Sequence, residues 1–565
     1  MAEIKETGKI LEDACFSCYS GESCIGYEKR TVIKQKSKCG EWRASSSKIQ
    51  IKLLSYFEIM RYGFPVELEV QYTETLSDKG NLCDFHVEIT SGGQPMKYFG
   101  MINQNSYGKE NVQMRIDSFG KNQMLNFSVP QVKKTEREKR KEGQVNYVKN
   151  LKNTLTEESE DENSADILTL QGTYGMEYLL QKNRLIPGDT RVFLRFEPTI
   201  SCFLKVQMEC FSEEIVLFPD GKQISLFPVK IHSEMVVTPD EKGQGDMAAE
   251  EEMIWIDGEG VIWKRYVPLM KMTYWRCSWE DVLQKFQPKR ESEKKSVSEV
   301  MEKEEPFSDV MEKTWDFGMQ MSVPILNFDA ESWAAEDNSE QKTYRLYAAE
   351  ENLVDFQSVF DDAEFQTGKI GKDEKEKNFI DITVYRSDGR GRKDFISSPP
   401  EEKDKAANHY IQTDMDKIKE IASGILPEEV EQEVLAREIE NFVHKYIIHK
   451  EGSRGFITAA EVAETRCGDC TEHAVFFAAL ARARNIPTRV VLGMVLVPEE
   501  RKFIWHMWNE CYIKGRWIPF DATISQGFIG VDHIRVNAGA LDQSDLAWML
   551  YSVAQIMGKI EIEIR

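Results

Sequence analysis

The stretch TRCGDCTEHAVFFAALAR, residues 465–482, places two cysteines three positions apart at the start of an apolar helical segment. Gly468 and Asp469 interrupt the preceding helical pattern, so Cys470 is predicted at or near the first turn of the next helix. Unpaired backbone N–H groups and the helix dipole favour a thiolate at such a position. The same N–H groups could stabilise an oxyanion beside the sulfur. The stretch therefore indicates a cysteine nucleophile, provided that a base lies nearby.

A general base and its partner are predicted on a downstream hairpin. A thiolate nucleophile needs such a base, and the base needs a side chain that orients it. Residues 503–513, FIWHMWNECYI, have the pattern of a strand that carries His506, and Lys514-Gly515 predicts a two-residue turn. In that register Asp521 lies one diagonal step from His506. Diagonal neighbours sit about 7–8 Å apart, within reach of an imidazole–carboxylate hydrogen bond.

These two segments together resemble a known family. GDCTEHAVFFAALARARNIPTRVV followed by WHMWNECYIKGRWIPFDAT is similar to the core of the transglutaminase-like superfamily of papain-type cysteine enzymes. The likeness covers about residues 410–540 and rests on a Gly-x-Cys turn, a helix ending in Arg-x-x-x-Ile-Pro-x-Arg, and the motifs His-x-Trp-x-Glu and Trp-x-x-x-Asp. The β-rich front and the DHIRV stretch at Asp532 also resemble large multidomain bacterial proteins of this group. The resemblance implies a papain-like catalytic domain.

The resemblance also implies roles for three residues. Cys470 would be the nucleophile, His506 the base and then the acid, and Asp521 the group that fixes the tautomer of His506. The implied reaction is acyl transfer, in which the thiolate attacks a glutamine side-chain or peptide amide and water or a lysine amine resolves the thioester. The expected partners are a protein or peptide substrate and an amine co-substrate. No cofactor or metal is implied, and the calcium-binding acidic loops of animal crosslinking enzymes are not evident.

Supporting or substrate-binding roles are predicted for four neighbours of this triad, namely His473, Trp505, Trp508 and Glu510. His473 follows Cys470 by about one helical turn and is expected to hold that turn through a polar contact rather than to catalyse. The side chain that completes the oxyanion hole has three candidates, which are Tyr446, Trp505 and Trp508.

Other interpretations of the cysteine pair stay open. Cys467 and Cys470 have the spacing of a redox pair, but thioredoxin-like motifs follow a strand, whereas a helix is predicted here. A zinc site would combine Cys467, Cys470, His473 and His506, yet its histidines lack an identifiable supporting group. Cys467 is either packed in the core or a reversible disulfide partner of Cys470. A domain of the same fold could also bind peptides without catalysis.

Composition restricts the partners and the compartment. The 95 acidic and 72 basic residues give a formal net charge of −23, which disfavours nucleic acid and anionic membranes as partners. No apolar run approaches the roughly 18 residues of a membrane helix, and no signal peptide is evident. The protein is expected in the cytoplasm as written, or in the periplasm or outside the cell if a signal peptide was removed. Near the start, Cys15, Cys18, Cys24 and Cys39 are interpreted as thiols of a strand region, with a disulfide left open for an exported protein.

The chain as a whole predicts a multidomain α+β protein. Alternating apolar residues in VELEVQYT and a hairpin signal at Asp257-Gly258 indicate a β-rich front. The predicted organisation is a β-rich domain (1–130), a charged insertion or loop (131–165), a second β-rich domain (166–288), a linker (289–314), a small mixed β domain (315–395) and the catalytic domain (405–565). The last of these is expected to fold alone.

Overall fold

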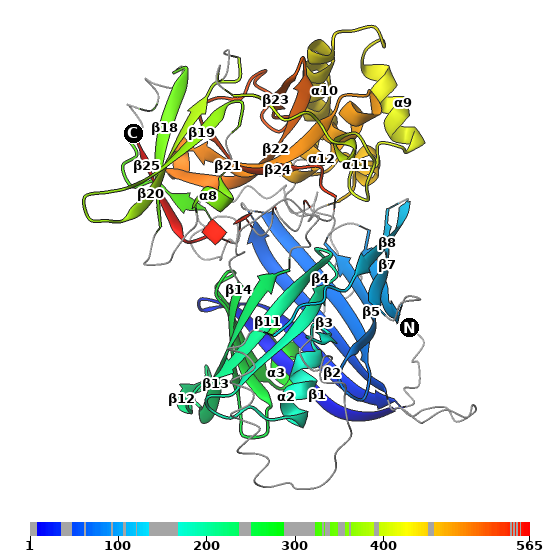
Figure 1. Ribbon diagram of the computed structural model, residues 1–565, viewed down its shortest axis with the longest axis vertical. Helices are drawn as coiled ribbons and strands as arrows, with labels where there is room; N and C mark the ends of the chain where they lie inside the picture. Colours follow the sequence, from blue (N-terminus) through cyan, green and yellow to red (C-terminus); the bar gives the residue numbers. More distant parts are fainter. Residues whose placement is uncertain are drawn as a thin grey trace.

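The computed structural model describes residues 8–35, 48–134, 168–236, 250–286, 322–449 and 457–565, with short gaps in the second, fifth and last of these ranges. Cys39, the predicted linker and most of the predicted charged insertion lie outside the described residues. The predicted α+β class is confirmed, because a β-rich front precedes a C-terminal part of mixed helices and strands (Figure 1).

The front of the chain forms one 16-stranded, mostly antiparallel sheet. It begins with β1 (Gly8–Ser20), β2 (Ser23–Gln35), β3 (Lys48–Arg61), β4 (Phe64–Leu76), β5 (Leu82–Thr90), β6 (Met96–Gln104), β7 (Glu110–Ser118) and β8 (Lys121–Ser128). It continues with β9 (Leu170–Gln171), β10 (Thr190–Glu197), β11 (Cys202–Cys210), β12 (Glu214–Leu217), β13 (Gln223–Met235), β14 (Glu250–Ile256), β15 (Ile262–Val267) and β16 (Met272–Cys277). Helices α2 (Gly175–Lys182) and α3 (Trp279–Lys285) accompany it.

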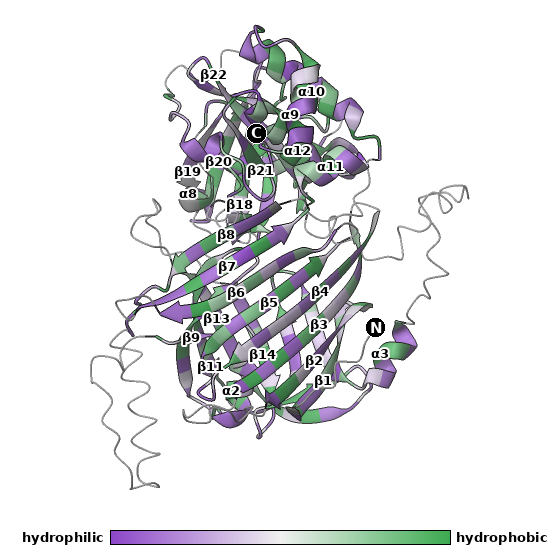
Figure 2. Ribbon diagram, turned by 90° about the vertical axis from the view of Figure 1, so that its right-hand side faces the viewer, coloured by the Kyte–Doolittle hydropathy of each residue, from purple (hydrophilic) through white to green (hydrophobic). Residues whose placement is uncertain are grey.

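The two predicted β-rich domains share this sheet. Strand β1 pairs with β2 on one side and with β16 on the other, so the segments 1–130 and 166–288 are hydrogen-bonded to each other along a common seam. An isolated bridge between Asn81 and Gln171 brings β9 back toward the start of β5, and Figure 2 shows the sheet strongly curved. In β4 the apolar Val66 and Tyr72 are buried while Glu67 and Gln71 are exposed, and the turn at Asp257 joins β14 to β15.

The cysteines of this region lie in strands. Cys15 and Cys18 are buried in β1, and Cys24 lies in β2. The ten cysteines in the described part of the chain are not joined in disulfides. The interpretation of the N-terminal cluster as strand thiols is therefore confirmed for these three residues.

The C-terminal part contains two further sheets and most of the helices. One sheet comprises β17 (Val323–Pro324), β21 (Thr488–Val497), β22 (Lys502–Ile513), β23 (Arg516–Phe520) and β24 (His533–Gly539). The other comprises β18 (Gln341–Ala348), β19 (Gln366–Lys372), β20 (Asn378–Tyr385) and β25 (Ile560–Ile564). The helices are α8 (Phe356–Val359), α9 (Asp416–Ile425), α10 (Gln432–Tyr446), α11 (Ala459–Thr465) and α12 (Cys470–Ala483), with short 3-10 turns at Glu402–Asp404 and Pro498–Glu500.

One hydrophobic core joins the predicted small β domain to the predicted catalytic domain. The last strand, β25, pairs with β18, and the side chains of both enter the cluster that also covers α12. Helix α12 lies at the centre of that cluster and is buried from Thr471 to Arg482. The sheet and α12 are also tied by a hydrogen bond of 3.0 Å from Nδ2 of Asn509 to the carbonyl of Ala474. The core therefore crosses the predicted boundary between 315–395 and 405–565.

The front sheet contacts the C-terminal part through its hairpin ends. The backbone N–H of Gln94 donates to Oε1 of Glu461 in α11 (3.1 Å), and Nε2 of Gln412 donates to the carbonyl of Phe119 (2.8 Å). Met96 packs against the C-terminal core. These contacts place the front sheet against the helix that directly precedes the Cys467–Cys470 turn. No helix in the described part of the chain combines the length and the apolar character that a membrane crossing requires.

Candidate active site

Cys470 is the first residue of α12, as the sequence predicts. Asp469 caps the helix: its carboxylate accepts a hydrogen bond from the N–H of Thr471, and its own N–H donates to Glu472 (both 2.9 Å). Gly468 has a φ of 150°, and a Cβ there would lie 2.2 Å from Cβ of Glu472. Only glycine fits this position. A capping box and one glycine thus hold the sulfur at the helix start.

His506 and Asp521 meet on the hairpin that the sequence predicts. Ile513 pairs with Arg516 across the Lys514-Gly515 turn, which confirms the predicted register. Nε2 of His506 lies 2.7 Å from Oδ2 of Asp521, so the expected imidazole–carboxylate contact is present.

Asp521 is anchored by further hydrogen bonds from its surroundings. Its second oxygen, Oδ1, accepts hydrogen bonds from the backbone N–H groups of Thr523 (2.8 Å) and Ile524 (3.3 Å). Its backbone N–H donates to Oε1 of Glu440 in α10 (3.0 Å). Glu440 is itself buried and paired with Arg437 (3.2 Å). The carboxylate is therefore held from the turn and from the neighbouring helix.

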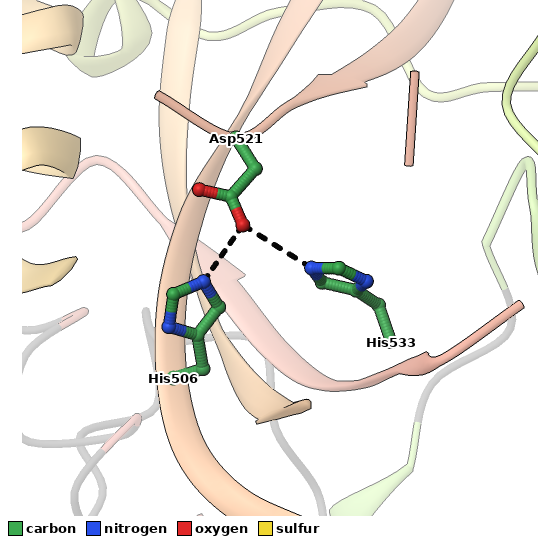
Figure 3. A group of neighbouring side chains, drawn as sticks. All are labelled: His506, Asp521 and His533. Carbon is green, nitrogen blue, oxygen red and sulfur yellow. Dashed lines mark hydrogen bonds and ion pairs between the residues drawn. The ribbon is translucent and has the colours of Figure 1, made fainter. Parts of the chain in front are cut away.

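His533 is a member of this cluster that the sequence analysis did not single out. It begins β24, and its Nε2 lies 3.2 Å from the same oxygen, Oδ2, of Asp521 (Figure 3). Its Nδ1 lies 2.8 Å from Oδ1 of Asp532. The sequence indicates the DHIRV stretch only through its resemblance to the family, which assigns no role to His533. An acid followed by a histidine at a strand start is a usable signal, but the pairing of β24 with β21 decides where that histidine points.

Charge is concentrated on these buried groups. Burial would lower the pKa of His506, but the charge and hydrogen bond of Asp521, followed by the contact with Cys470, raise it well above its ordinary value. Burial likewise opposes the charged form of His533, yet Asp532 and Asp521 raise its pKa to about 9. Burial would raise the pKa of Asp521, but His506 and His533 hold it well below its usual range. The cluster therefore contains imidazolium and carboxylate groups near neutral pH.

Cys470 completes the group from the helix side. Its side chain lies close enough to His506 to contribute to the raised pKa of that imidazole. Along one edge, strand β22 pairs first with β17, at Lys502 and Phe503, and then with β23, from Asn509 onward. His506 lies between these two paired segments. Cys470 is half-buried, whereas His506 and Asp521 are buried. The arrangement joins a partly accessible thiol, an imidazole and a shielded carboxylate.

Residues 419–522 match the family model described as the transglutaminase-like superfamily. The chain contains a transglutaminase-like domain. This domain has the fold of a superfamily built on cysteine-based catalysis, and the matched residues include Cys470, His506 and Asp521. No match was found among curated proteins.

Two solved structures are similar to parts of the chain. One is described as a "Putative Cysteine Protease from Cytophaga hutchinsonii"; it is 15% identical, with a TM-score of 0.23, and the match covers 43% of this chain and 82% of that one. The other is a β-barrel-like protein of a domain of unknown function from Brucella abortus; it is 11% identical, with a TM-score of 0.27, and the match covers 47% of this chain and 93% of that one. At these TM-scores neither structure bears on the chemistry of this chain.

The two predicted tryptophans of the transglutaminase-like domain lie on opposite faces of β22. Trp508 shares the face of His506, with ring centroids 6.1 Å apart, and it packs nearly perpendicular to the ring of His533, with centroids 5.2 Å apart. Trp505 packs into the large core on the other face. Gly493 stands opposite His506 in β21, and a Cβ there would lie 2.4 Å from the Trp508 ring. The glycine therefore makes room for the indole beside the imidazole.

The remaining predicted supporting residues make structural contacts. Glu510 forms ion pairs with Arg489 (2.9 Å) and Arg535 (3.3 Å) on the same sheet face. The hydroxyl of Tyr446 donates to the carbonyl of Ala463 (2.7 Å), which ties α10 to α11. These two residues thus support elements around the site.

His473 and Cys467 flank the nucleophile. Nδ1 of His473 lies 2.5 Å from the carbonyl of Asp469, a polar contact of the kind expected to hold the turn. Cys467 is buried, and its Sγ donates to the carbonyl of Thr465 (3.2 Å). The redox hypothesis also loses its expected context, since α11 and not a strand precedes the pair.

A metal ion could be considered at one place in the described residues. His506, Asp521 and His533 bring one ligand atom each within 4.8 Å of one another, whereas the zinc ligands considered from the sequence, Cys467, Cys470, His473 and His506, do not gather in this way. The raised pKa values of both histidines favour protons on the nitrogens that face Asp521. A protonated nitrogen has no lone pair for a metal. Hydrogen bonds account for the cluster.

Proposed function

We propose that the transglutaminase-like domain catalyses acyl transfer from amide groups through a thioester on Cys470. The proposal rests mainly on the contact of Nε2 of His506 with Oδ2 of Asp521 at 2.7 Å. Cys470 lies near enough to His506 to raise the pKa of the imidazole. A nucleophile, a base and an orienting acid are the parts that such chemistry requires. Cys470 is the one of these three residues that is partly exposed, so it is the residue that a substrate can reach.

Each group has its own role in the proposed reaction. Because Nε2 of His506 binds Asp521, Nδ1 is the ring nitrogen left for Cys470. With the thiol proton on His506, the thiolate attacks the amide carbonyl carbon, and N–H groups at the start of α12 stabilise the oxyanion. His506 then donates that proton to the departing ammonia or amine as the C–N bond breaks, which leaves a thioester. Water or an amine attacks the thioester while His506 accepts its proton, and the thiolate is released.

The substrate class follows from the same chemistry. We propose a protein or peptide that presents a glutamine side chain or a peptide amide, with water or a lysine amine as the second reactant. Hydrolysis and crosslinking share every step up to the thioester. They differ only in which nucleophile reaches that thioester first.

Mass spectrometry of a glutamine-rich protein incubated with this chain tests the proposal. Samples with and without a primary amine separate amine incorporation, conversion of glutamine to glutamate, and backbone cleavage. Cys470→Ala should abolish all three, since no other step forms the thioester. A covalent substrate adduct on Cys470 after rapid acid quenching would identify the intermediate.

Cys83→Ala provides the matched control. Cys83 is a partly exposed thiol in β5 of the front sheet, outside the site, so its removal should leave turnover unchanged. If substrates bind to the wild type but none is converted under any condition, the domain is a peptide-binding module. If Cys470→Ala converts substrate as fast as the wild type, the nucleophile is wrong.

A further inference from the structure

His533 has no role in the reaction outlined above, yet it is built into the same buried cluster. It is 5% exposed and lies opposite Val495 at the start of β24. Its two ring nitrogens face two different carboxylates, Asp521 at 3.2 Å and Asp532 at 2.8 Å. Ionised carboxylates only accept hydrogen bonds, so both nitrogens must donate. The geometry by itself therefore calls for an imidazolium at this position.

Within the described parts of the chain, three titratable side chains make the contacts recorded around His533. The titratable groups that face it are Asp521, Asp532 and His506, whose ring centroid lies 5.8 Å away. Cys470 acts on the neighbouring His506. The ring of Trp508 packs nearly perpendicular to the imidazole of His533. The next charged residue on the same sheet face, Arg535, is paired with Glu510.

We propose that His533 is a positioning residue of this site, which fixes the Asp521 carboxylate and balances its charge, and thereby sets the proton affinity of His506. This inference rests on the proposed function of Cys470, His506 and Asp521. Oδ2 of Asp521 serves both histidines, so its negative charge is shared between two cations (Figure 3). The cation at His533 opposes a second positive charge on His506 only 5.8 Å away. Without the cation at His533, the full negative charge of Asp521 would stabilise the protonated form of His506.

The consequence is a definite direction of change. With His533 replaced by a neutral side chain, His506 should release its proton at a higher pH. A charge at this distance acts with an energy that corresponds to about one to two pH units at an effective dielectric constant of roughly 20 to 40. A more basic His506 would also be a weaker acid toward the leaving amine. Turnover should fall while substrate binding changes little.

The pH dependence of Cys470 alkylation by iodoacetamide measures this effect without any substrate. A thiolate paired with an imidazolium becomes more reactive when the imidazolium loses its proton, so the upper transition of the rate profile reports His506. In His533→Gln, whose amide can still donate to Asp521, this transition should move upward by about one to two units. Mass spectrometry of the Cys470 peptide gives the rate, and circular dichroism checks the fold.

His444→Gln is the matched control. His444 contacts the loop after Asp521 through the carbonyls of Ala522 (3.2 Å) and Thr523 (3.0 Å), not through the carboxylate. A purely structural disturbance of the loop would lower the melting temperature in both variants. Only His533→Gln should move the transition. A folded His533→Gln protein with the wild-type transition would overturn the proposal.

A second variant covers the case in which His533→Gln does not fold. Asp532→Asn leaves the imidazole in place but removes one of its two carboxylates, so His533 becomes neutral at a lower pH. The upper transition should then move in the same direction by a smaller amount, and an unchanged transition would contradict the proposal. These profiles are independent of turnover. A shifted transition without any conversion of amide substrate would refute the proposed function and leave the role of His533 standing.

Discussion

One carboxylate oxygen of Asp521 contacts two histidines: Oδ2 lies 2.7 Å from Nε2 of His506 and 3.2 Å from Nε2 of His533. The other oxygen is held by the backbone N–H groups of Thr523 and Ile524. The carboxylate cannot rotate without breaking contacts at both oxygens. Its position therefore determines the orientation of the imidazole that faces Cys470.

Asp521→Asn tests this orientation. An amide has only one oxygen, so with the turn contacts kept its NH₂ group faces both histidines. His506 would then have to present a bare Nε2 and carry its proton on Nδ1, which is the wrong tautomer for accepting the thiol proton. We expect turnover and Cys470 alkylation at neutral pH to fall on the order of 10³- to 10⁴-fold. The circular dichroism spectrum should be retained. Near-normal turnover would show that Asp521 does not orient His506.

Gly493→Ala tests the packing beside the imidazole. An added Cβ would lie 2.3 Å from the carbonyl oxygen of Ile534 and 2.4 Å from the ring of Trp508, which stacks near His506. The backbone oxygen cannot yield easily, so the unfolding free energy should fall by about 1–3 kcal/mol. The alkylation rate of Cys470 should fall as well. Denaturant titration and iodoacetamide kinetics measure the two effects.

Gly424→Ala is the control for that substitution. Gly424 lies in α9, and a Cβ there has nothing within 4 Å. Alanine favours a helix over glycine, so this variant should be as stable as the wild type or more stable by up to about 1 kcal/mol. Equal losses of unfolding free energy and of alkylation rate in both variants would mean that the contact with Trp508 does not cause the effect of Gly493→Ala.

Cys467 should act as a core residue rather than as a switch. Its Sγ would have to leave the carbonyl of Thr465 to reach Cys470 across the turn. We expect iodoacetamide to label Cys470 faster than Cys467. Mild oxidant followed by dithiothreitol should affect the wild type and Cys467→Ala alike. A protected, fully recoverable state that only the wild type shows would instead establish a redox pair.

The site could be predicted largely from local sequence. Cys470 at a helix start follows from Gly468 and Asp469, and the contact of His506 with Asp521 follows from a two-residue turn and strand parity. Both depend on residues close together along the chain. His533 depends on the pairing of β24 with β21, which no local pattern specifies.

The limits of the domain prediction have the same origin. The seam between β1 and β16 joins residues about 260 positions apart, as in the contact of Ser17 with Cys277. The pairing of β18 with β25 likewise spans the whole C-terminal part. Alternation shows that each segment is a strand with one buried face, but it does not say which strand is the neighbour. Boundaries predicted from composition alone therefore fell within one continuous sheet and within one continuous hydrophobic core.

The C-terminal part should fold as residues 322–565 and not as 405–565. The shorter fragment would lose β18 as the partner of β25 and the buried hydrogen bond from Tyr344 to the carbonyl of Val531 (2.7 Å). It would also lose two contacts between Gln366 and the backbone of Arg535 (both 2.8 Å). We expect a cooperative thermal transition from 322–565 only. A cooperative transition from 405–565 at the same temperature would show that the second sheet is dispensable.

Glu74→Gln tests a buried acid of the front sheet. Glu74 is fully buried in β4, and burial raises its pKa to about 8, although its Oε1 accepts a hydrogen bond from the N–H of Tyr174 at the start of α2 (3.1 Å). The folded state thus binds this proton more tightly than the unfolded chain. Its contribution to stability is full below the ordinary pKa of 4.5 and is lost as the pH rises through about 8.

A glutamine at position 74 keeps the acceptor oxygen and does not ionise. The variant should melt at the wild-type temperature at pH 5 and above it at pH 9. Glu22→Gln, in the exposed turn between β1 and β2, is the control and should follow the wild type at both pH values. Equal melting temperatures of Glu74→Gln and the wild type at pH 9 would mean that Glu74 ionises in the folded sheet without cost.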